Sequence, residues 1–259
     1  MKGTDLLLRA VTLALACVLL APLALPAAAA AKRKPGIDVS RFQGRIDWQR
    51  VGETEVRFAF VQASRGEGTD CAVAPTECGP DEFYDRNYVR AREQGIRVGP
   101  YHRAFTGGEG RLGIKRDSRR EAKVFLAEVG ELHKRDLLPV LDVETPFGDL
   151  DERELRVWVR NWLTKVEKEL GAKPIIYTNY SSWQATGDTT SFARQGHPLW
   201  VANFDVESPL VPALNWNGLG WSIWQYTNTG RVKGISGNVD ENVARVSLRS
   251  ISVGGAREP

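Results

Sequence analysis

Four carboxylates in this sequence stand where short apolar runs end. They are Asp38, Asp142, Glu144 and Asp240, and they come from three different predicted strands. When parallel strands close into a barrel, polar side chains at the strand ends meet at one rim, and the active sites of such barrels lie at that rim. The placement of these four residues therefore predicts an acidic cluster at one end of the molecule.

Asp142 and Glu144 have the most informative spacing of the four. Residues two apart on a strand share a face, so both carboxylates would point the same way. A carboxyl group beside another carboxylate has a raised pKa, which a general acid near neutral pH needs, and glycoside hydrolysis uses two carboxyl groups across the bond that is cut. Two alternatives stay open: an Asp-x-Glu triplet also occurs in exposed loops, and Asp38 can cap the turn that follows it.

Other kinds of site have less support. The three histidines are scattered, and the sequence has no His-x-x-x-His, no Cys-x-x-Cys, no nucleophile elbow and no phosphate-binding or dinucleotide-binding glycine motif. A divalent metal held by His102 and the four carboxylates is a weaker alternative, and we expect neither a metal nor a cofactor. Trp158 and Trp162 lie on a helical stripe typical of a core, whereas Trp224, near a strand end, fits either packing or sugar stacking.

The elements that must position these residues alternate between short apolar runs and longer amphipathic stretches. The helical periodicity is clearest over 117–129 and 151–170. The first five apolar runs are 37–39, 57–63, 96–102, 137–143 and 174–178, and three more, 199–204, 220–226 and 237–243, follow with short connections. We therefore predict an α/β fold, an irregular TIM-like barrel with five βα units followed by three strands, with a parallel sheet implied by the alternation.

Length, charge and cysteine content narrow the class further. The chain has 259 residues, with 35 Lys and Arg against 32 Asp and Glu, and shows no charge excess of the kind that marks nucleic-acid binders. Residues 1–31 have a basic start, an uncharged middle and an alanine-rich end, which predicts a signal peptide; a signal-anchor helix is the alternative. We expect a secreted or periplasmic, cell-envelope protein with a barrel over 32–249, a tail over 250–259 and a disulfide between Cys71 and Cys78.

Seven short motifs connect these expectations to a known family. They are Gly36-Ile-Asp-Val-Ser40, Gly99-Pro-Tyr-His102, Pro139-Val-Leu-Asp-Val-Glu144, Ile176-Tyr-Thr178, Leu199-Trp-Val-Ala202, Trp224-Gln-Tyr-Thr227 and Val239-Asp-Glu-Asn242. With these motifs in this order, the chain resembles the family 25 glycoside hydrolases, the Chalaropsis-type lysozymes, over residues 35–246. The resemblance implies an irregular barrel and N-acetylmuramidase activity, which cuts the β-1,4 bond between N-acetylmuramic acid and N-acetylglucosamine in bacterial peptidoglycan.

The resemblance also implies roles for the residues at the rim. Glu144 matches the general acid, and Asp142 matches the neighbouring carboxylate that orients the substrate acetamido group or stabilises the developing positive charge. Asp38 and Asp240 match two further rim carboxylates. The aromatic groups that would line the sugar groove are Tyr101, Tyr177 and Trp224. We further expect a monomer that binds peptidoglycan, binds no nucleic acid and stays out of the membrane once the leader is removed.

The chain departs from the family pattern close to the same rim. Relatives commonly have Lys-Ala-Thr-Glu-Gly after the second strand, where this chain has Gln62-Ala-Ser-Arg65-Gly, and Arg103 stands where an aromatic residue is usual. These changes leave the four carboxylates intact but alter the charge around them. Two alternatives to a muramidase remain: a non-catalytic glycan-binding protein of the cell wall, and a hydrolase of another N-acetylated glycan such as chitin.

Overall fold

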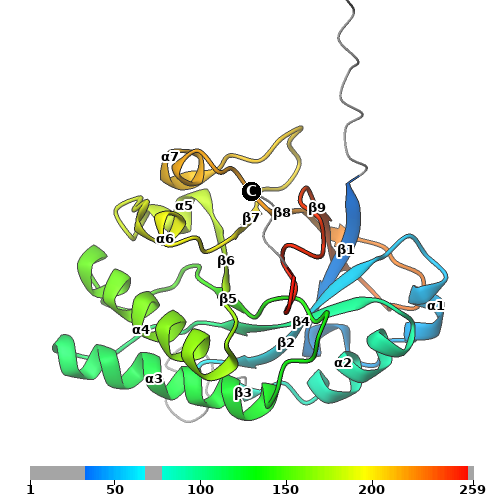
Figure 1. The fold of residues 1–259 in the computed structure, drawn as a ribbon, viewed down its shortest axis with the longest axis horizontal. Helices are drawn as coiled ribbons and strands as arrows, with labels where there is room; N and C mark the ends of the chain where they lie inside the picture. The colour runs from blue at the N-terminus through cyan, green and yellow to red at the C-terminus, as the bar shows by residue number, and fades with distance from the viewer. Residues whose placement is uncertain (1–32, 68–77, 256–259) are drawn as a thin grey trace, which may run out of the picture. The chain divides into compact units, whose positions relative to one another are not determined.

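Eight strands form a closed barrel in the computed structural model, which describes residues 33–67 and 78–255 (Figure 1). Their order around the barrel is β1-β2-β4-β5-β6-β7-β8-β9, and β9 pairs with β1 to close it. A two-residue strand, β3, extends the end of β2. The strands are β1 Lys34–Val39, β2 Phe58–Arg65, β3 Gly79–Pro80, β4 Arg97–Arg103, β5 Val140–Asp142, β6 Ile175–Asn179, β7 Leu199–Ala202, β8 Ile223–Gly230 and β9 Val239–Ala244.

Two apolar layers stabilise the barrel, one inside it and one between the barrel and the helices. β2 contributes to both: Phe58 and Phe60 belong to the inner layer, whereas Ala59 and Val61 belong to the outer layer, and all four are fully buried. Successive side chains of a strand point to opposite faces, so a strand covered on both faces has no polar position. This explains the uninterrupted apolar run at the start of β2.

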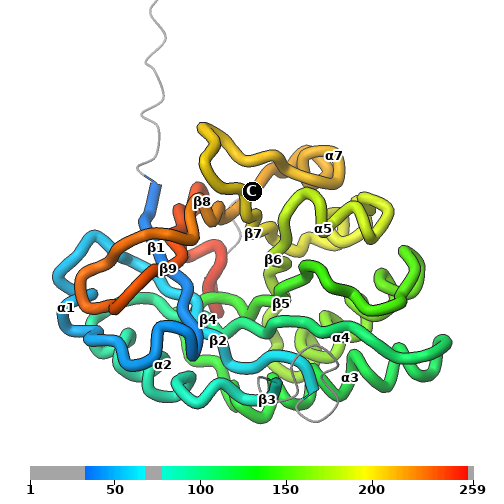
Figure 2. Tube along the Cα trace, turned by 180° about the vertical axis from the view of Figure 1, so that it is seen from behind, coloured from blue at the N-terminus to red at the C-terminus, as the bar shows by residue number. Residues whose placement is uncertain are grey.

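The two longest helices, α3 (Gly110–Val129) and α4 (Glu152–Leu170), lie side by side in both views of the chain (Figures 1 and 2). The carboxylate of Asp151 caps the start of α4, and Gly171, with a φ of 63°, ends it. Of the five residues predicted to form the apolar stripe of α4, Leu155, Trp158, Trp162 and Val166 are fully buried and Leu170 is partly buried. The other helices are a short 3₁₀ helix Arg41–Gln43, α1 Trp48–Gly52, α2 Tyr84–Glu93, α5 Tyr180–Gln184, α6 Ser191–Arg194 and α7 Pro212–Asn217.

The predicted barrel of five βα units and three final strands is confirmed, with two differences. β9 runs antiparallel to both of its neighbours, so the sheet is mixed and not wholly parallel. The connection between β7 and β8 contains the short helix α7, in a gap where the sequence shows no helical pattern. From Ala213 to Trp216, α7 has left-handed backbone with φ between 52° and 55°, and the buried indole of Trp216 donates to the carbonyl of His197 at 2.8 Å. Tertiary packing of this kind leaves no periodic signal in the sequence.

The C-terminal segment packs against the end of the barrel at which β5 begins. The tail expected from Ser250 onward is shorter than predicted, because Ile251 and Ser252 are buried and the backbone N–H of Leu138 donates to the carbonyl of Ile251 at 2.9 Å. The predicted signal peptide and Cys71 lie outside the described residues, so the leader and the disulfide to Cys78 stay predictions. Within the described residues, no helix is both long enough and apolar enough to span a membrane.

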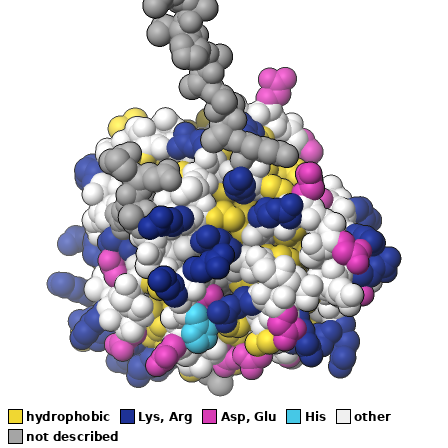
Figure 3. Space-filling view, turned by 45° about the vertical axis from the view of Figure 1, so that its right-hand side comes forward, with side chains coloured by type: hydrophobic (Ala, Val, Ile, Leu, Met, Phe, Trp, Pro, Cys, Tyr) yellow, Lys and Arg dark blue, Asp and Glu magenta, His cyan; other side chains and the backbone are white. Residues whose placement is uncertain are grey.

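Basic side chains gather where the first strands begin. Arg33, Lys34, Arg57 and Arg97 line a pocket of about 300 Å³ at the starts of β1, β2 and β4. Figure 3 shows Lys and Arg side chains collected near the centre of one face of the molecule. The predicted acidic rim belongs to the other end of the barrel, where these strands end.

Candidate active site

The four predicted carboxylates line one pocket of about 270 Å³ at the rim where the parallel strands end: Asp38, Asp142, Glu144 and Asp240. Asp38 is the last residue but one of β1, and Asp142 is the last residue of β5. Asp240 reaches the same rim from the start of β9, because β9 is antiparallel and places Asp240 opposite Asp38. The convergence expected from the sequence is therefore present, although one of the strands runs the other way.

Asp38 belongs to a buried hydrogen-bond network. Its Oδ2 accepts hydrogen bonds from Gln225 Nε2 at 2.9 Å and from Asn242 Nδ2 at 2.7 Å. The amide oxygen of Gln225 accepts from the hydroxyl of Tyr177 at 2.9 Å, and that of Asn242 accepts from the indole N–H of Trp200 at 2.8 Å. All five side chains are buried, so the network holds a carboxylate and two aromatic rings in one arrangement.

Burial and proximity raise the pKa values of Asp38 and Asp240. Burial is the main cause of the raised pKa of Asp38, and the charge of Asp240 adds to it, while the hydrogen bonds from Asn242 and Gln225 oppose it. Burial also raises the pKa of Asp240 to about 6, against the effect of its hydrogen bond with Asp38. Two facing carboxyl groups resist ionising together, so this pair titrates as a unit and retains a proton up to higher pH than isolated aspartates do.

Arg103 bridges the other two carboxylates. Its guanidinium lies 3.5 Å from Asp142 Oδ1 and 3.4 Å from Glu144 Oε1, and it donates to the backbone carbonyls of Glu144 and Thr145 at 2.9 Å each. Burial raises the pKa of Asp142, and the charge of Arg103 opposes that rise. The side chain of Glu144 is 30% exposed and that of Asp142 is 10% exposed, so Glu144 is the more accessible of the two.

Two buried oxygens in the wall of the pocket accept no hydrogen bond in the described part of the chain, although the Arg103 guanidinium lies 3.5 Å from one of them, Asp142 Oδ1. They are Oδ1 of Asp142 and Oε1 of Gln62. A buried acceptor without a donor destabilises a protein by about 1–3 kcal/mol. An amide N–H of a ligand, such as that of an N-acetyl group, is a donor that either oxygen can accept from. Gln62 was singled out in the sequence only as a departure from the family pattern.

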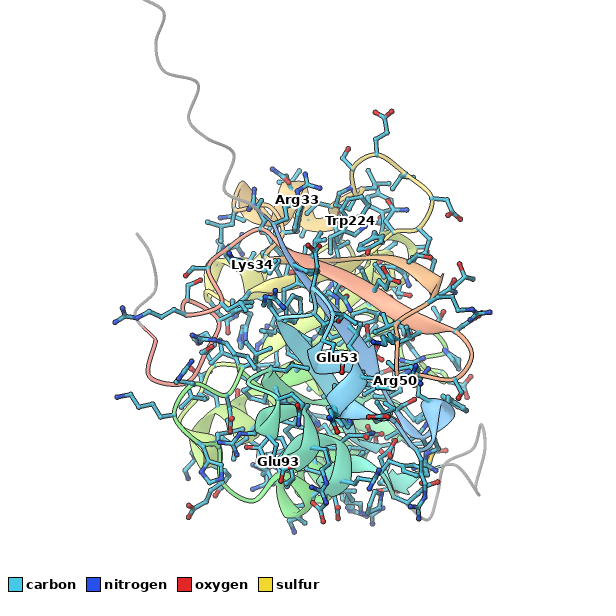
Figure 4. All side chains as sticks on the ribbon, turned by 90° about the vertical axis from the view of Figure 1, so that its right-hand side faces the viewer. Arg33, Lys34, Arg50, Glu53, Glu93 and Trp224 are labelled. Atoms are coloured by element: carbon cyan, nitrogen blue, oxygen red, sulfur yellow. The ribbon has the colours of Figure 1, made fainter. Side chains whose placement is uncertain are left out.

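Tyr101 and Tyr177 line the pocket as predicted, but Trp224 does not. Trp224 points to the opposite face of β8 from Gln225, and its indole donates to the carbonyl of Asn203 at 2.8 Å. Figure 4 shows it beside Arg33, whose guanidinium lies 6.0 Å from the indole ring.

The tryptophan that lines the pocket is Trp200 of β7. Sequence analysis missed it because it stands inside an apolar run, where core packing is the default expectation. Gln225 was missed for a related reason, although a single amide within a buried strand is itself a signal, since such a group needs a polar partner.

His102 points away from the pocket, into the layer between β4 and α3. One ring nitrogen lies 2.8 Å from Glu121 Oε2 and the other lies 2.8 Å from Ser64 Oγ. Burial lowers the pKa of His102 to about 3 and raises that of Glu121. Burial thus favours the neutral form of each group. The hypothesis of a metal bound jointly by His102 and the rim carboxylates is wrong, because His102 faces the other side of its strand.

Comparison with known proteins agrees with this geometry. The family model described as glycosyl hydrolases family 25 matches residues 37–235. The chain is 34% identical over 230 residues to the uncharacterized protein YegX of Escherichia coli (strain K12), covering 86% of this chain and 74% of that protein. It is 33% identical over 215 residues to lysozyme M1 of Streptomyces globisporus, covering 80% of this chain and 66% of that protein.

Solved structures show the same fold. A bacterial lysozyme from Streptomyces coelicolor superposes with a TM-score of 0.70 at 30% identity, over 84% of this chain and 94% of that one. A muramidase from Trichobolus zukalii superposes with a TM-score of 0.68 at 22% identity, over 83% of this chain and 94% of that one. From the extent of the family match and from these relatives, we conclude that the chain belongs to glycosyl hydrolases family 25 and is a glycoside hydrolase.

Proposed function

We propose that this chain is an exported lysozyme that hydrolyses the β-1,4 bond between N-acetylmuramic acid and N-acetylglucosamine in peptidoglycan. The observation that carries the proposal is the convergence of four carboxylates, from β1, β9 and the end of β5, in one pocket with Tyr101, Tyr177 and Trp200. Relatives named lysozyme and muramidase support a cell-wall glycan as the substrate. The leader-like composition of residues 1–31 supports export to the envelope or beyond it.

Glu144 is the proposed general acid. It is the more exposed member of the pair that Arg103 contacts, so it is the one that can reach the glycosidic oxygen of a bound glycan. In the catalytic step its carboxyl proton moves to the leaving oxygen, and the bond between that oxygen and the anomeric carbon breaks. The sugar that remains acquires oxocarbenium-like positive charge, which the anionic carboxylates of the pocket stabilise. The oxygen of a water molecule then bonds to the anomeric carbon, and the proton that the water loses goes to a carboxylate of the pocket.

Asp142 and Gln62 are the proposed contacts for the N-acetyl group. Each has one buried side-chain oxygen at the pocket wall that accepts no hydrogen bond, and the acetamido N–H of an N-acetylated sugar supplies a donor. Arg103 supports the anionic form of Asp142 at this position. The aromatic rings of Tyr101, Tyr177 and Trp200 offer apolar surface for the sugar faces. Together these groups favour an N-acetylated glycan over an unsubstituted one.

Replacement of Glu144 by Gln tests the proposal. We expect release of reducing sugar from purified peptidoglycan to fall by about 100- to 10,000-fold, the contribution typical of a general acid. Glu207→Gln, at an exposed glutamate outside the pocket, is the matched control and should keep wild-type turnover. Circular dichroism of both variants would show whether the fold is retained.

Mass spectrometry of the wild-type products identifies the bond that is cut. New reducing ends that carry N-acetylmuramic acid would support the proposal, whereas N-acetylglucosamine at those ends would overturn the proposed bond. Full turnover by the Glu144→Gln variant would refute the role of Glu144. Wild-type protein that sediments with walls but releases no sugar would establish the non-catalytic alternative.

A further inference from the structure

The exposed face of α3 carries only positive charge between residues 111 and 123. Its exposed ionisable side chains are Arg111, Lys115, Arg116, Arg119, Arg120 and Lys123, and we call these six residues the α3 cationic surface. The two carboxylates in the same stretch turn inward. Asp117 accepts hydrogen bonds from the indole of Trp158 and the backbone N–H of Gly107, and Glu121 is buried against His102. The negative charge of this helix is hidden, and its positive charge faces solvent.

Little within the described residues neutralises the α3 cationic surface. Of the six residues, only Arg120 forms an ion pair there, with Glu67 at 3.4 Å. Arg111, Lys115, Arg119 and Lys123 follow one another at four-residue spacing, so they form one ridge with successive charges about 6 Å apart along the axis. Like charges four residues apart destabilise a helix. A ligand with regularly repeated negative charges would neutralise this row of cations and remove the repulsion that destabilises the helix.

The ridge borders a groove of about 680 Å³ between α3 and α4. Arg111 and Lys115 line it from α3, and Arg153, Arg156 and Arg160 line it from α4. The acidic residues of the groove are engaged locally, because Asp151 and Glu154 form the reciprocal cap at the start of α4. Arg156 is also engaged, because it donates to the carbonyl of Thr186 at 2.6 Å and pairs with Glu152 at 3.6 Å. The groove therefore offers the other four cationic side chains, from two helices, to one elongated ligand.

A second pocket, of about 630 Å³, lies between the α3 cationic surface and Phe105 and has a mixed charge. Arg116 and Arg120 line it together with Glu67, Glu109 and Asp117, and Arg120 pairs with Glu67. The ring of Phe105 lies 5.1 Å from the guanidinium of Arg65 and 5.3 Å from that of Arg103, and both arginines line the active-site pocket. A glycan strand held by the carboxylates would thus lie close to Arg65 and Arg103, and the pocket beside Phe105 separates these two arginines from the α3 cationic surface.

We propose that the α3 cationic surface binds an anionic phosphodiester polymer that is attached to the glycan on which the active site acts. This inference rests on the proposed function for the identity of the glycan. Arginine, which supplies four of the six residues, pairs with phosphate oxygens through two parallel N–H donors. A single pocket separates the α3 cationic surface from the arginines of the active-site pocket, which favours a polymer carried by the substrate itself, because both sites would then engage one molecule.

A single-stranded nucleic acid fits this surface less well. Proteins that bind such strands combine cations with aromatic side chains on which the bases stack. The one aromatic residue of α3 is Phe125, which is fully buried. The basic pocket at the starts of β1, β2 and β4 is a weaker candidate, because Arg57 there donates to the backbone carbonyls of Thr54 and Val56 and Arg97 donates to Ser252.

The test compares three forms of the full chain: the wild type, an α3 variant and a control variant. The α3 variant is Arg111→Gln/Lys115→Gln/Arg119→Gln/Lys123→Gln. The control, Arg45→Gln/Arg50→Gln/Arg86→Gln/Arg90→Gln, removes the same charge from exposed positions around α1 and α2. Affinity is measured for purified poly(glycerol phosphate), for walls that carry such a polymer, and for the same walls stripped of it by hydrofluoric acid.

We expect the α3 variant to lose at least about tenfold in affinity for the polymer and for the polymer-bearing walls. The control should stay within about twofold of the wild type, because its charges lie on another face. All three proteins should bind stripped walls equally. Equal losses in the two variants, or no loss in the α3 variant, would overturn the proposal.

Two further outcomes keep this proposal separate from the proposed function. Tighter binding of the wild type to duplex DNA than to poly(glycerol phosphate) at the same salt concentration would overturn the wall-polymer assignment in favour of a nucleic acid. The rate of sugar release from stripped walls reports on the active site alone and should be equal in all three proteins. If no form released sugar, the proposed function would fail, while the binding comparison would still decide the role of the surface.

Discussion

Arg103 is the residue that ties the active site of this chain together, since it contacts both carboxylates at the end of β5 and two backbone carbonyls beside them. Lysine in its place keeps the charge but has one amino group, which cannot span the same four oxygens. We therefore expect Arg103→Lys to reduce kcat by about 10- to 100-fold, equivalent to one or two charge-assisted hydrogen bonds. Steady-state kinetics on purified peptidoglycan would measure this effect.

The pH dependence of activity in two variants, Arg103→Lys and Arg103→Gln, separates an electrostatic role of Arg103 from a structural one. Arg103 opposes the rise in the pKa of Asp142, so Arg103→Gln should move the ionisation of Asp142 to higher pH. The activity profile should follow in that direction. Arg50→Lys, at an exposed position on α1, serves as the control. An unchanged profile together with unchanged kcat in both Arg103 variants would contradict the role given to Arg103.

Asp240 gives a prediction about stability and pH. Its pKa is about 6 in the folded chain, above the ordinary value of 3.8 for an aspartate, so between these values the native state binds a proton that the unfolded chain has lost. The free energy of unfolding therefore falls as pH rises through this window, by roughly 1–3 kcal/mol. Asp240→Asn removes the ionisation, so the variant should be more stable than the wild type near pH 7.

Urea unfolding at about pH 4 and about pH 7 measures the difference, which should shrink at the lower pH because Asp240 is then neutral in the wild type as well. The same substitution should slow catalysis near neutral pH, since the pocket loses an anion that opposes the positive charge of the transition state. If the Asp240→Asn variant were no more stable than the wild type near pH 7 and fully active, ionisation of Asp240 would not destabilise the fold and Asp240 would have no role in catalysis.

The sequence predicted the carboxylates of the site better than its aromatic and amide groups. Asp142 interrupts an apolar run, and such an interruption is visible in one dimension. Trp200 and Gln225 point inward from strands buried on both faces, so periodicity does not separate them from core residues. Trp224 precedes Gln225 on β8 and points to the opposite face. Because side chains alternate along a strand, predicting which of the two faces the pocket requires knowing which way the first side chain of β8 points.

Among the secondary-structure elements, β4 and α3 are joined by the buried pair of His102 and Glu121. Glu121 also accepts from the backbone N–H of Phe105, which begins the connection to α3. Glu121→Ala would leave that N–H and a ring nitrogen without partners and would open a cavity, so we expect a loss of about 2–4 kcal/mol in the free energy of unfolding. Glu121→Gln keeps one donor and one acceptor and should lose much less.

The comparison of these two variants by thermal or urea unfolding tests whether the pair is neutral. Burial lowers the pKa of His102 and raises that of Glu121, so both shifts favour the neutral forms, and an amide is a close substitute for a neutral carboxyl group. If the pair were instead an ion pair, Glu121→Gln would leave an uncompensated buried cation and would be about as damaging as Glu121→Ala. Similar stability of the two variants would therefore contradict the neutral assignment.

Elements with local signals were predictable, and those shaped by tertiary contacts were not. α4 has a capping aspartate, an apolar stripe and a terminal glycine, and the structure places it within one residue of the prediction. α3 begins at Gly110, seven residues before the predicted start, because its first turns carry cations on the outside and bury only Ile114. The antiparallel direction of β9 depends on how the chain returns to β1, which no local pattern records.

Over the whole molecule, a nearly balanced total charge conceals three separate regions. Carboxylates concentrate at the rim where the parallel strands end, while cations concentrate on α3 and at the starts of the first strands. The total excess of three positive charges excludes a strongly basic protein, but a net charge does not show where in the structure the charges lie. The total charge therefore does not predict a basic surface on α3, because folding turns Asp117 and Glu121 of this helix inward and leaves the basic residues outside.

This segregation predicts that the response to salt depends on the substrate. Added salt screens the contacts between the α3 cationic surface and a phosphodiester polymer, and it returns counterions to that polymer. Binding to polymer-bearing walls should therefore weaken steeply as salt rises. For four neutralised phosphates, the slope of log K against log salt is about −3, taking the coefficient for flexible single strands.

Binding to walls stripped of the polymer should change much less, because the carboxylate pocket is small and largely buried. The α3 variant Arg111→Gln/Lys115→Gln/Arg119→Gln/Lys123→Gln should show the shallow slope on both kinds of wall, whereas the control variant at Arg45, Arg50, Arg86 and Arg90 should keep the steep one. Sedimentation over a series of salt concentrations measures all of these slopes. If the slope of log K against log salt were the same for the wild type on intact and on stripped walls, the protein would bind only the glycan and not an attached polyanion.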